Sequence, residues 1–205
     1  MSVHLIRNPV VVNRISWIWD RRNSAEQCST ILYEAAMFLF YEVVEYLQSQ
    51  PHDDKAAQAD KTEVRSVVTP LFPDSIEFAD VHDESFEESQ LAVVTPLRGR
   101  VSLGDPFIFC LPKAGYVRAD KFFNRDRKDL PPLDFHGKIG VVADTLIDKD
   151  TSAFVQGFKS KGAAKVIIAS VFTSPEELEK IHAAHPDVEI FTASIADARG
   201  LIGSI

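Results

Sequence analysis

The 205-residue sequence has little of three things that would narrow its class at once: cysteine, long apolar runs and excess basic charge. Its two cysteines, Cys28 and Cys110, are too few for a secreted disulfide scaffold, so we expect reduced, buried thiols. The most apolar run, Ile31 to Leu47, contains three glutamates, which argues against a membrane span. With 22 basic and 30 acidic residues, the net charge of −8 argues against nucleic acid and anionic membranes as partners.

What remains is an ordinary globular composition, 45% hydrophobic and 25% charged. The length suits a single domain with a hydrophobic core. Cysteine usage favours the cytoplasm or the mitochondrial matrix. The first nineteen residues hold two arginines and no acid, as transit peptides do, but Asn8-Pro9 and the valines after it favour a folded segment.

The negative charge is concentrated between Ser49 and Gln90. That window contains eleven acidic and three basic residues, so its net charge of −8 equals that of the whole chain. Two short apolar runs among the acids predict an antiparallel β-arm over residues 55–90, inserted into one domain of residues 1–205. The arm is either a solvated surface extension or a docking surface for a basic protein partner.

A long helix is predicted ahead of the arm. Ser24 and Gln27 have capping-box spacing, and nearly every position from Ile31 to Leu47 is apolar. A helix that is apolar on all sides is buried, so we expect it to cross the interior or to lie at a subunit interface.

After the arm, short apolar strands alternate with helices. Strands are expected at residues 91–95, 115–117, 138–144, 165–172 and 188–193, with helical segments at 101–111, 151–161 and 174–184. This alternation predicts an α/β fold with a parallel sheet covered by helices on both faces. Because chemistry in such sheets lies beyond the carboxyl ends of the strands, the segment Asp144–Ser152 is the first place to look for a site.

Several segments resemble the uracil phosphoribosyltransferase family. His185–Ile195 reads HPDVEIFTASI, where the family carries AHPDVE-[LI]-[YF]-TA. Val93–Gly99 (VVTPLRG) is similar to VVPILRAG, and Gly115–Arg118 is similar to G-[ML]-Y-R. The early segment NPVVVNRI and the pair Tyr41-Glu42 also fit. The resemblance implies a type I phosphoribosyltransferase fold, in which uracil and phosphoribosyl pyrophosphate give UMP and pyrophosphate with Mg²⁺.

The same resemblance implies a phosphoribosyl pyrophosphate site, and here the sequence departs from the family. The family loop DPMLATGG-[ST] reads DTLIDKDTS, so Asp150 and Thr151 replace both glycines and block the close approach of backbone to phosphate. Asp148 and Asp150 would each repel an anion by about 4 kcal/mol at about 4 Å and an effective dielectric of about 20. The residues matching the site, now vestigial, are Arg98, Arg118, Asp144, Thr151 and Ser152.

Three of these residues have a structural alternative. Asp144 is a ribose ligand or a helix N-cap, and Arg98 and Arg118 meet an anion or pair with neighbouring acids. His182 and His185 lie three residues apart with no third ligand in view, so no metal site is expected.

The family's PGLGD-type segment, whose backbone contacts uracil, does not occur in the sequence. We therefore expect a non-catalytic member acting as a structural or regulatory subunit, and no cofactor, with Mg²⁺ needed only by an active enzyme. Its expected assembly is a homodimer or hetero-oligomer formed through the first helix and the β-arm. The alternatives are an active uracil phosphoribosyltransferase of pyrimidine salvage, and a regulator that senses UMP or phosphoribosyl pyrophosphate.

Overall fold

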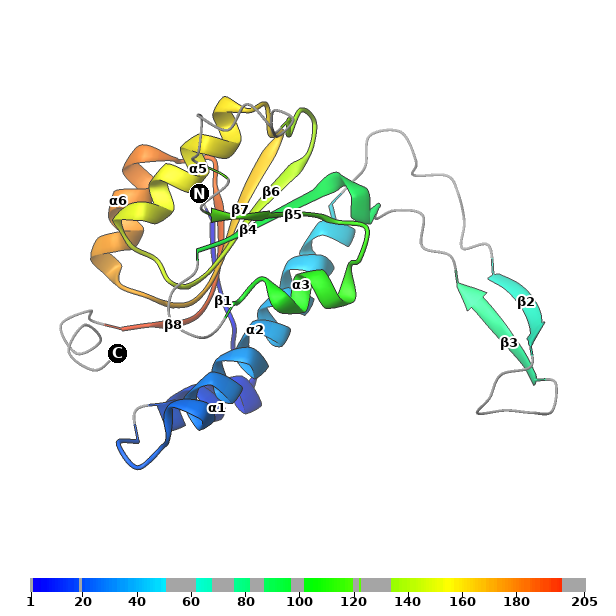
Figure 1. Cartoon of the computed structure of the whole chain (residues 1–205), viewed down its shortest axis with the longest axis horizontal. Helices are drawn as coiled ribbons and strands as arrows, with labels where there is room; N and C mark the ends of the chain where they lie inside the picture. Colours follow the sequence, from blue (N-terminus) through cyan, green and yellow to red (C-terminus); the bar gives the residue numbers. More distant parts are fainter. Residues whose placement is uncertain are drawn as a thin grey trace. The chain divides into compact units, whose positions relative to one another are not determined.

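The computed structural model describes residues 2–18, 20–50, 62–67, 76–81, 87–96, 102–119, 122 and 134–196. The chain divides into two units, residues 1–45 with 88–205, and residues 46–87. In the first unit, six strands form one sheet in the order β1-β8-β7-β6-β4-β5 (Figure 1). All neighbouring strands run parallel, which confirms the predicted α/β sheet.

The elements follow the predicted alternation closely. The strands of the sheet are β1 (Ser2–Leu5), β4 (Leu91–Thr95), β5 (Gly115–Arg118), β6 (Ile139–Leu146), β7 (Lys165–Thr173) and β8 (Glu189–Ile195). The helices are α1 (Pro9–Ile18), α2 (Ala25–Gln48), α3 (Asp105–Cys110), α5 (Lys149–Ser160) and α6 (Pro175–Ala184), with a 3-10 turn at Glu88–Gln90.

The second unit contains two strands, β2 (Thr62–Val67) and β3 (Ile76–Val81). They pair antiparallel, with Thr62 opposite Val81 and Val67 opposite Ile76. Two antiparallel strands are therefore present where the alternation of apolar and acidic residues predicted them. Their side chains lie outside the described part of the chain.

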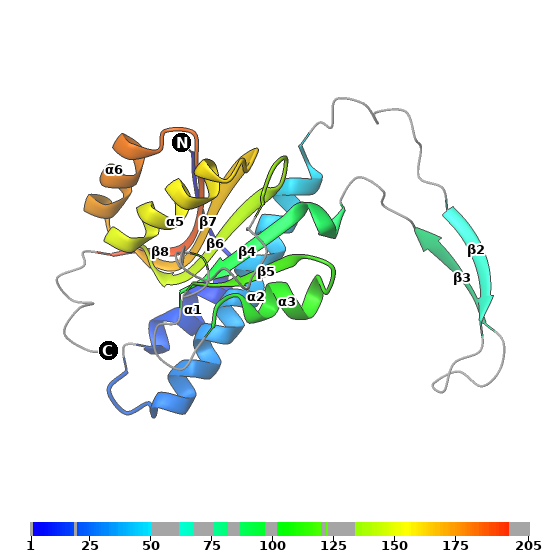
Figure 2. The same ribbon diagram turned by 45° about the horizontal axis from the view of Figure 1, so that its top comes forward.

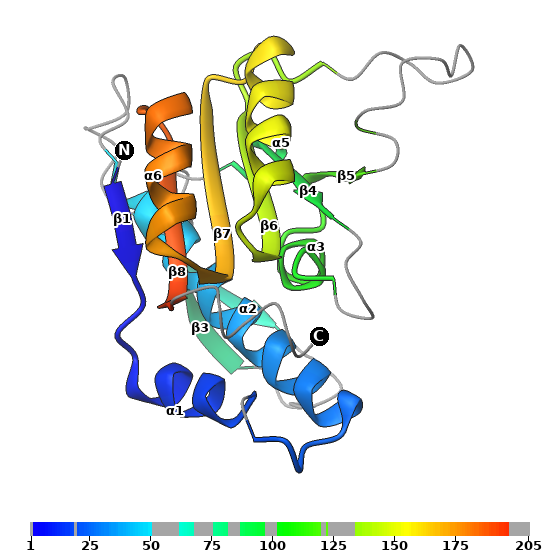
Figure 3. The same cartoon turned by 90° about the vertical axis from the view of Figure 1, so that its left-hand side faces the viewer.

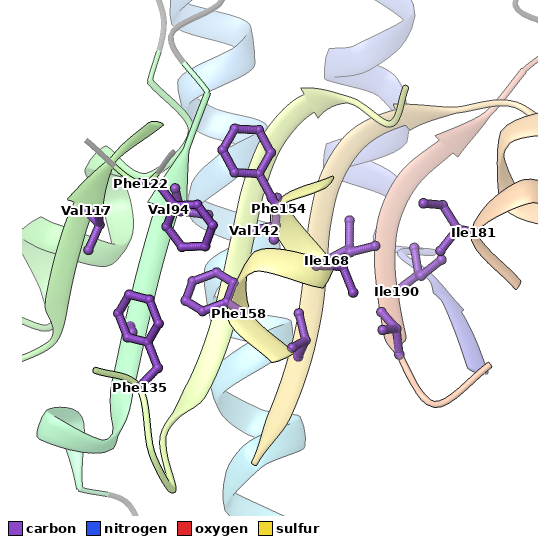
Figure 4. Packing of buried hydrophobic residues seen from close by; sticks show 14 of the residues in the cluster. Val94, Val117, Phe122, Phe135, Val142, Phe154, Phe158, Ile168, Ile181 and Ile190 are labelled. Carbon is purple, nitrogen blue, oxygen red and sulfur yellow. The ribbon is translucent and has the colours of Figure 1, made fainter. Parts of the chain in front are cut away.

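Two helical layers cover the parallel sheet (Figures 2 and 3). Helices α5 and α6 lie on one face, and α1, α2 and α3 lie on the other. Side chains alternate between the faces along each strand, so Val142, Ile168 and Ile190 point together toward α5 and α6 (Figure 4). Both layers therefore anchor to the same strands through alternate residues.

The core beneath α5 is built from phenylalanine rings (Figure 4). Phe122, Phe135, Phe154 and Phe158 lie with ring centroids 4.8 to 5.9 Å apart. Gly157 makes this possible, because a Cβ at that position would lie 2.3 Å from Cε1 of Phe122. The helix backbone and an aromatic ring thus meet directly in the core.

The N-terminal segment is folded, as Asn8-Pro9 indicated, and it adds a strand and a helix that the sequence pattern did not reveal. β1 pairs with β8, where the His4 ring stacks on Phe191 with centroids 4.4 Å apart. His4 Nε2 also lies 2.8 Å from a carboxylate oxygen of Glu189. A strand of four residues is too short to show a period, so only its partner strand defines it.

One expectation for the long helix is wrong: α2 does not cross the interior. Its sheet-facing side buries Ala35, Leu39 and Val43, while Tyr33 and Tyr41 are 40% and 58% exposed. A helix in an outer layer has one side on the sheet and one side turned away, whatever its composition. The alternative, a subunit interface, stays a prediction.

The expectation of buried thiols is also wrong. Cys28, near the start of α2, and Cys110, the last residue of α3, are both free and half-buried. Helix ends reach the surface of this layer, so a cysteine placed there keeps part of its exposure. No helix in the described ranges is long and apolar enough to cross a membrane.

Candidate functional site

The sheet has a topological switch point between β4 and β6. From β4 the chain passes to β5 at one edge and then returns to β6 on the other side of β4. In open parallel sheets, ligands bind beyond the carboxyl ends of the strands at such a point. The ends of β4 and β6, near Thr95 and Asp144, are therefore where this fold would hold a ligand.

A row of buried polar side chains crosses the sheet beside the switch point. Asp144, Ser170 and Thr192 are neighbours in the register of β6, β7 and β8, and all three are buried. Ser170 Oγ donates to Thr192 Oγ1 at 3.3 Å, and Asp144 Oδ1 accepts the Thr145 N–H at 2.7 Å. Because side chains alternate, the row shares the α5/α6 face with the apolar row two residues earlier.

Asp144 therefore belongs to strand β6 and is not a helix N-cap, so that interpretation of it is wrong. Sequence reasoning singled out Asp144 and missed Ser170 and Thr192. Their signal was a small polar residue within two mostly apolar runs, KVIIASVF and VEIFTA. Only the register shows that all three side chains lie in one row.

The N-terminus of α5 is closed by the chain's own side chains. The Asp148 carboxylate accepts the Asp150 N–H at 2.8 Å, and Thr151 Oγ1 accepts the Asp148 N–H at 3.1 Å. The two residues form a capping box in which Thr151 is completely buried. Asp148 is thus the N-cap, and its negative charge already occupies the positive end of the helix dipole.

Ser152, the next residue, faces α6. Its Oγ lies 2.8 Å from Nε2 of His185, which is buried at the end of α6. Burial and the nearby Lys159 ammonium lower the pKa of His185, so the imidazole is neutral near pH 7. Lys159 also pairs with Asp187 and thereby lowers the pKa of that carboxyl. Ser152 and His185 therefore join two helices.

The described residues do not include the side chains of Arg98 and Arg118, the two arginines that the sequence assigned to the site. Arg98 lies outside the described residues, as does the side chain of Arg118. The Arg118 backbone ends β5 directly beside Thr95 at the end of β4. Among the described residues, no three His, Cys, Asp or Glu side chains converge as metal ligands. His182 is exposed while His185 is buried.

Known proteins are similar to this chain in sequence or in fold. Uracil phosphoribosyltransferases of Staphylococcus aureus strains Newman and N315 are each 23% identical over 204 residues, covering 95% of this chain and 87% of theirs. The structure of the AQ2163 protein from Aquifex aeolicus matches with a TM-score of 0.63 at 18% identity, over 94% of this chain and 86% of that one. Adenine phosphoribosyltransferase from Leishmania donovani matches with a TM-score of 0.50 at 14% identity, over 96% and 84%.

No protein-family model matches the sequence. The structural matches nevertheless confirm the predicted type I phosphoribosyltransferase-like fold, with its parallel sheet between two helical layers. The sequence matches cover nearly the whole chain and carry the same name as the family that HPDVEIFTASI and VVTPLRG resembled. The chain is therefore similar in sequence to uracil phosphoribosyltransferases over nearly its whole length, and its fold is that of a type I phosphoribosyltransferase.

Proposed function

We propose that this chain is a non-catalytic uracil phosphoribosyltransferase-like protein, which acts as a structural or regulatory subunit of an oligomer built through α2 and the β-arm. The observation that carries the proposal is the closed N-terminus of α5. An enzyme of this fold needs that helix end for the 5′-phosphate of phosphoribosyl pyrophosphate. Here the Asp148 carboxylate accepts the Asp150 N–H, and Thr151 Oγ1 accepts the Asp148 N–H in return.

The energetics of that helix end oppose a phosphate. An N-cap side chain is worth about 1 kcal/mol to its helix, which a ligand must offset before it gains any contact. The exposed Asp150 adds a second negative charge in the first turn of α5. A phosphate dianion approaching this end therefore meets two carboxylates where the fold normally offers amide groups.

The alternative is an active uracil phosphoribosyltransferase that holds its phosphate differently. It is favoured by the name of the relatives and by the buried Asp144 at the switch point. A regulator that binds UMP or phosphoribosyl pyrophosphate without turnover would use the same edge of the sheet. An active uracil phosphoribosyltransferase would also need Mg²⁺. Among the described residues no three His, Cys, Asp or Glu side chains lie together as metal ligands, so no step is assigned to the metal.

An enzyme assay distinguishes the non-catalytic protein from an active enzyme. Purified full-length chain is given uracil, phosphoribosyl pyrophosphate and Mg²⁺, with a Staphylococcus aureus uracil phosphoribosyltransferase as positive control. We expect no UMP above background. Saturable turnover that disappears in the Asp144→Ala variant would overturn the proposal and establish the enzyme.

A thermal unfolding series completes the comparison. A sensor would be stabilised by UMP or phosphoribosyl pyrophosphate according to RT ln(1 + [L]/Kd), without forming product. For a subunit that has lost the site, we expect the same melting temperature with and without either ligand. A melting temperature that rises with ligand, without product formation, would favour the regulator over the structural subunit.

A further inference from the structure

The connection between α1 and α2 carries a short basic motif that lies outside the candidate site. Arg21-Arg22-Asn23-Ser24 places two arginines three and two residues before a serine. No other serine or threonine in the 205-residue sequence follows two arginines at these positions. The connection lies at the end of its helical layer, away from the sheet (Figures 1 and 3). The motif therefore needs an explanation apart from the core and the site.

The side chains of this motif are accessible from solvent. Arg21, Arg22 and Ser24 are all exposed, and the side chain of Arg22 is 89% exposed. The motif follows Ile18, the last residue of α1, and ends directly before Ala25, the first residue of α2. Surface connections and helix ends open at little cost in free energy, so an enzyme can bind this segment in extended form.

Local hydrogen bonds hold the connection in the free chain. The Arg22 guanidinium donates to the Asp20 carboxylate at 2.7 Å, and these hydrogen bonds lower the pKa of Asp20 to about 2. Ser24 Oγ accepts the Gln27 N–H at 3.2 Å, and the Gln27 side chain accepts the Ser24 N–H at 2.7 Å. Ser24 and Gln27 thus form the capping box that their spacing predicts. The Ser24 hydroxyl serves this box as an acceptor, so the box does not engage its proton.

We propose that Ser24 is a phosphorylation site for a basophilic protein kinase, an enzyme whose acidic cleft binds arginines two and three residues before the acceptor serine. Kinases select their substrates by such charge patterns, because each guanidinium pairs with carboxylates of the cleft. In the reaction, Ser24 Oγ attacks the γ-phosphorus of ATP and its proton passes to the catalytic carboxylate of the kinase. The bond between the γ-phosphorus and the bridging oxygen breaks, and ADP leaves.

A comparison with Ser16 shows why Ser24 is the better acceptor. Ser16 also follows an arginine by two residues, but Asn13 stands three residues before it. Ser16 lies within α1, where its Oγ donates to the Asn13 carbonyl at 2.6 Å, and Arg14 lies 3.1 Å from Glu34. A kinase would have to unwind α1 to reach Ser16. At Ser24 it has to open only the connection and the first turn of α2.

A phosphate on Ser24 would change both the charge and the cap of this helix end. The segment Asp20–Ser24 has a net charge of +1, which a phosphate group changes to about −1 near pH 7. The phosphate oxygens would accept the Gln27 N–H that now bonds to Ser24 Oγ, and the helix dipole favours their charge. Arg22 could then pair with the phosphate, which guanidinium groups bind through two hydrogen bonds. Phosphorylation would therefore strengthen the cap of α2.

The inference does not depend on whether the chain catalyses a reaction, so it is separate from the proposed function. The first experiment incubates the folded full-length chain with ATP, Mg²⁺ and the catalytic subunit of cAMP-dependent protein kinase, a probe that prefers this arginine pattern. Mass spectrometry counts the phosphates on the intact chain, and fragmentation locates them. We expect one phosphate per chain, on Ser24. No incorporation, or phosphate on other residues alone, overturns the inference.

Variants of the motif test what the kinase binds. Ser24→Ala should take up no phosphate. Arg21→Gln/Arg22→Gln should lower kcat/KM for phosphorylation by on the order of 100-fold or more, because two charged hydrogen bonds to the kinase are lost. The matched control Arg14→Gln removes an arginine outside the motif and should leave kcat/KM unchanged. A double variant that is phosphorylated as fast as the parent contradicts the assignment.

Asp20 offers a test that is specific to this connection. Asp20→Asn removes the carboxylate that pairs with Arg22, so the guanidinium becomes free to bind the kinase. We expect kcat/KM to rise by up to about 5-fold, the contribution of an exposed ion pair. A variant with the parent's kcat/KM or a lower one would show that the kinase does not bind Arg22.

Thermal unfolding tests the effect of the phosphate on α2. The phosphorylated chain should melt at a higher temperature than the unmodified chain, and high salt should reduce the difference by screening the phosphate. Equal or lower melting temperatures after phosphorylation would contradict a phosphate that caps α2.

Discussion

The two helical layers both pack on the sheet but differ on their outer surfaces. Large exposed apolar residues occur on α1, α2 and α3, and none occurs on α5 or α6 in the described chain. On α6, Lys180 lies 2.9 Å from Glu176 and 2.8 Å from Glu177, and both carboxylates raise the pKa of its ammonium. The α5/α6 layer thus exposes charged side chains, whereas the α1–α3 layer exposes large apolar ones.

The same contrast extends to helix ends. Asp148 caps α5, and Ser174 caps α6 by accepting the Glu177 N–H at 3.2 Å. Helices α5 and α6 begin just after the carboxyl ends of β6 and β7. Side chains of the chain itself therefore accept hydrogen bonds from helix amides that could otherwise bind an anion. This difference between a closed layer and an open one is what the following changes test, from the largest expected effect to the smallest.

The largest effect should come from phenylalanine truncation in the closed layer. Phe158→Ala empties a ring site that is fully buried and should lower the free energy of unfolding by about 3–5 kcal/mol. Phe109→Ala, in the open layer, removes a ring that is 80% exposed and should change the stability of the monomer by no more than about 0.5 kcal/mol. Urea unfolding of both variants measures the two losses in the free energy of unfolding. Similar losses would contradict the contrast between the layers.

A smaller effect should follow from Gly157→Ala. Alanine for glycine usually stabilises a helix by about 0.4–1 kcal/mol, but here the new methyl group would overlap Phe122, with 2.3 Å to Cε1. Overpacking should reverse the sign and destabilise the protein by about 1–3 kcal/mol. Thermal unfolding measures the sign of this change. A higher melting temperature than the parent's would show that Phe122 does not pack on α5 as described.

Loss of a helix cap should lower the free energy of unfolding by less than these core substitutions. Asp148→Ala removes the N-cap of α5 and should cost about 1 kcal/mol, and Ser174→Ala should cost a similar amount at α6. Chemical denaturation with both variants measures this pair. If Asp148→Ala is instead neutral or stabilising, the carboxylate does not cap α5, and the argument for a self-closed helix end loses its basis.

The smallest effect is a pH dependence. Burial and then Lys159 lower the pKa of His185 below its ordinary 6.5, so the unfolded state binds more protons than the folded state below about pH 6.5. The contribution of His185 to stability is therefore complete above that pH and declines as the pH falls toward its folded pKa. Stability curves between pH 5 and 7 should be flatter for His185→Gln than for the parent.

Periodicity predicted most of the sheet because its strands are buried on both faces and read as apolar runs. The strand 165–172 and the helix 174–184 were placed almost to the residue, since Lys165 and Ser174 mark real boundaries. β1 was missed because four residues carry no period. The exposure of Tyr33 and Tyr41 could not be foreseen either, because composition does not say which side of a helix lacks a neighbour.

The replaced glycines identified the segment Asp144–Ser152 as the place to examine, but they did not predict the capping box that its side chains form. Sequence reasoning treated Asp148 as a repelling charge, and the structure shows its carboxylate bonded to an amide of its own helix. The row of Asp144, Ser170 and Thr192 depends on strand register, which no single segment contains. Local chemistry was therefore predictable, and its assembly across strands was not.

The central claim is that Asp148 and Thr151 close the N-terminus of α5 against phosphate. Its most direct test is calorimetric titration of pyrophosphate into the parent and into a variant carrying Asp148→Ala, Asp150→Gly and Thr151→Gly. The account predicts no binding heat for the parent and measurable binding for the variant, whose helix end then offers free amides. Pyrophosphate binding by the parent that is equal to or tighter than binding by the variant would contradict it.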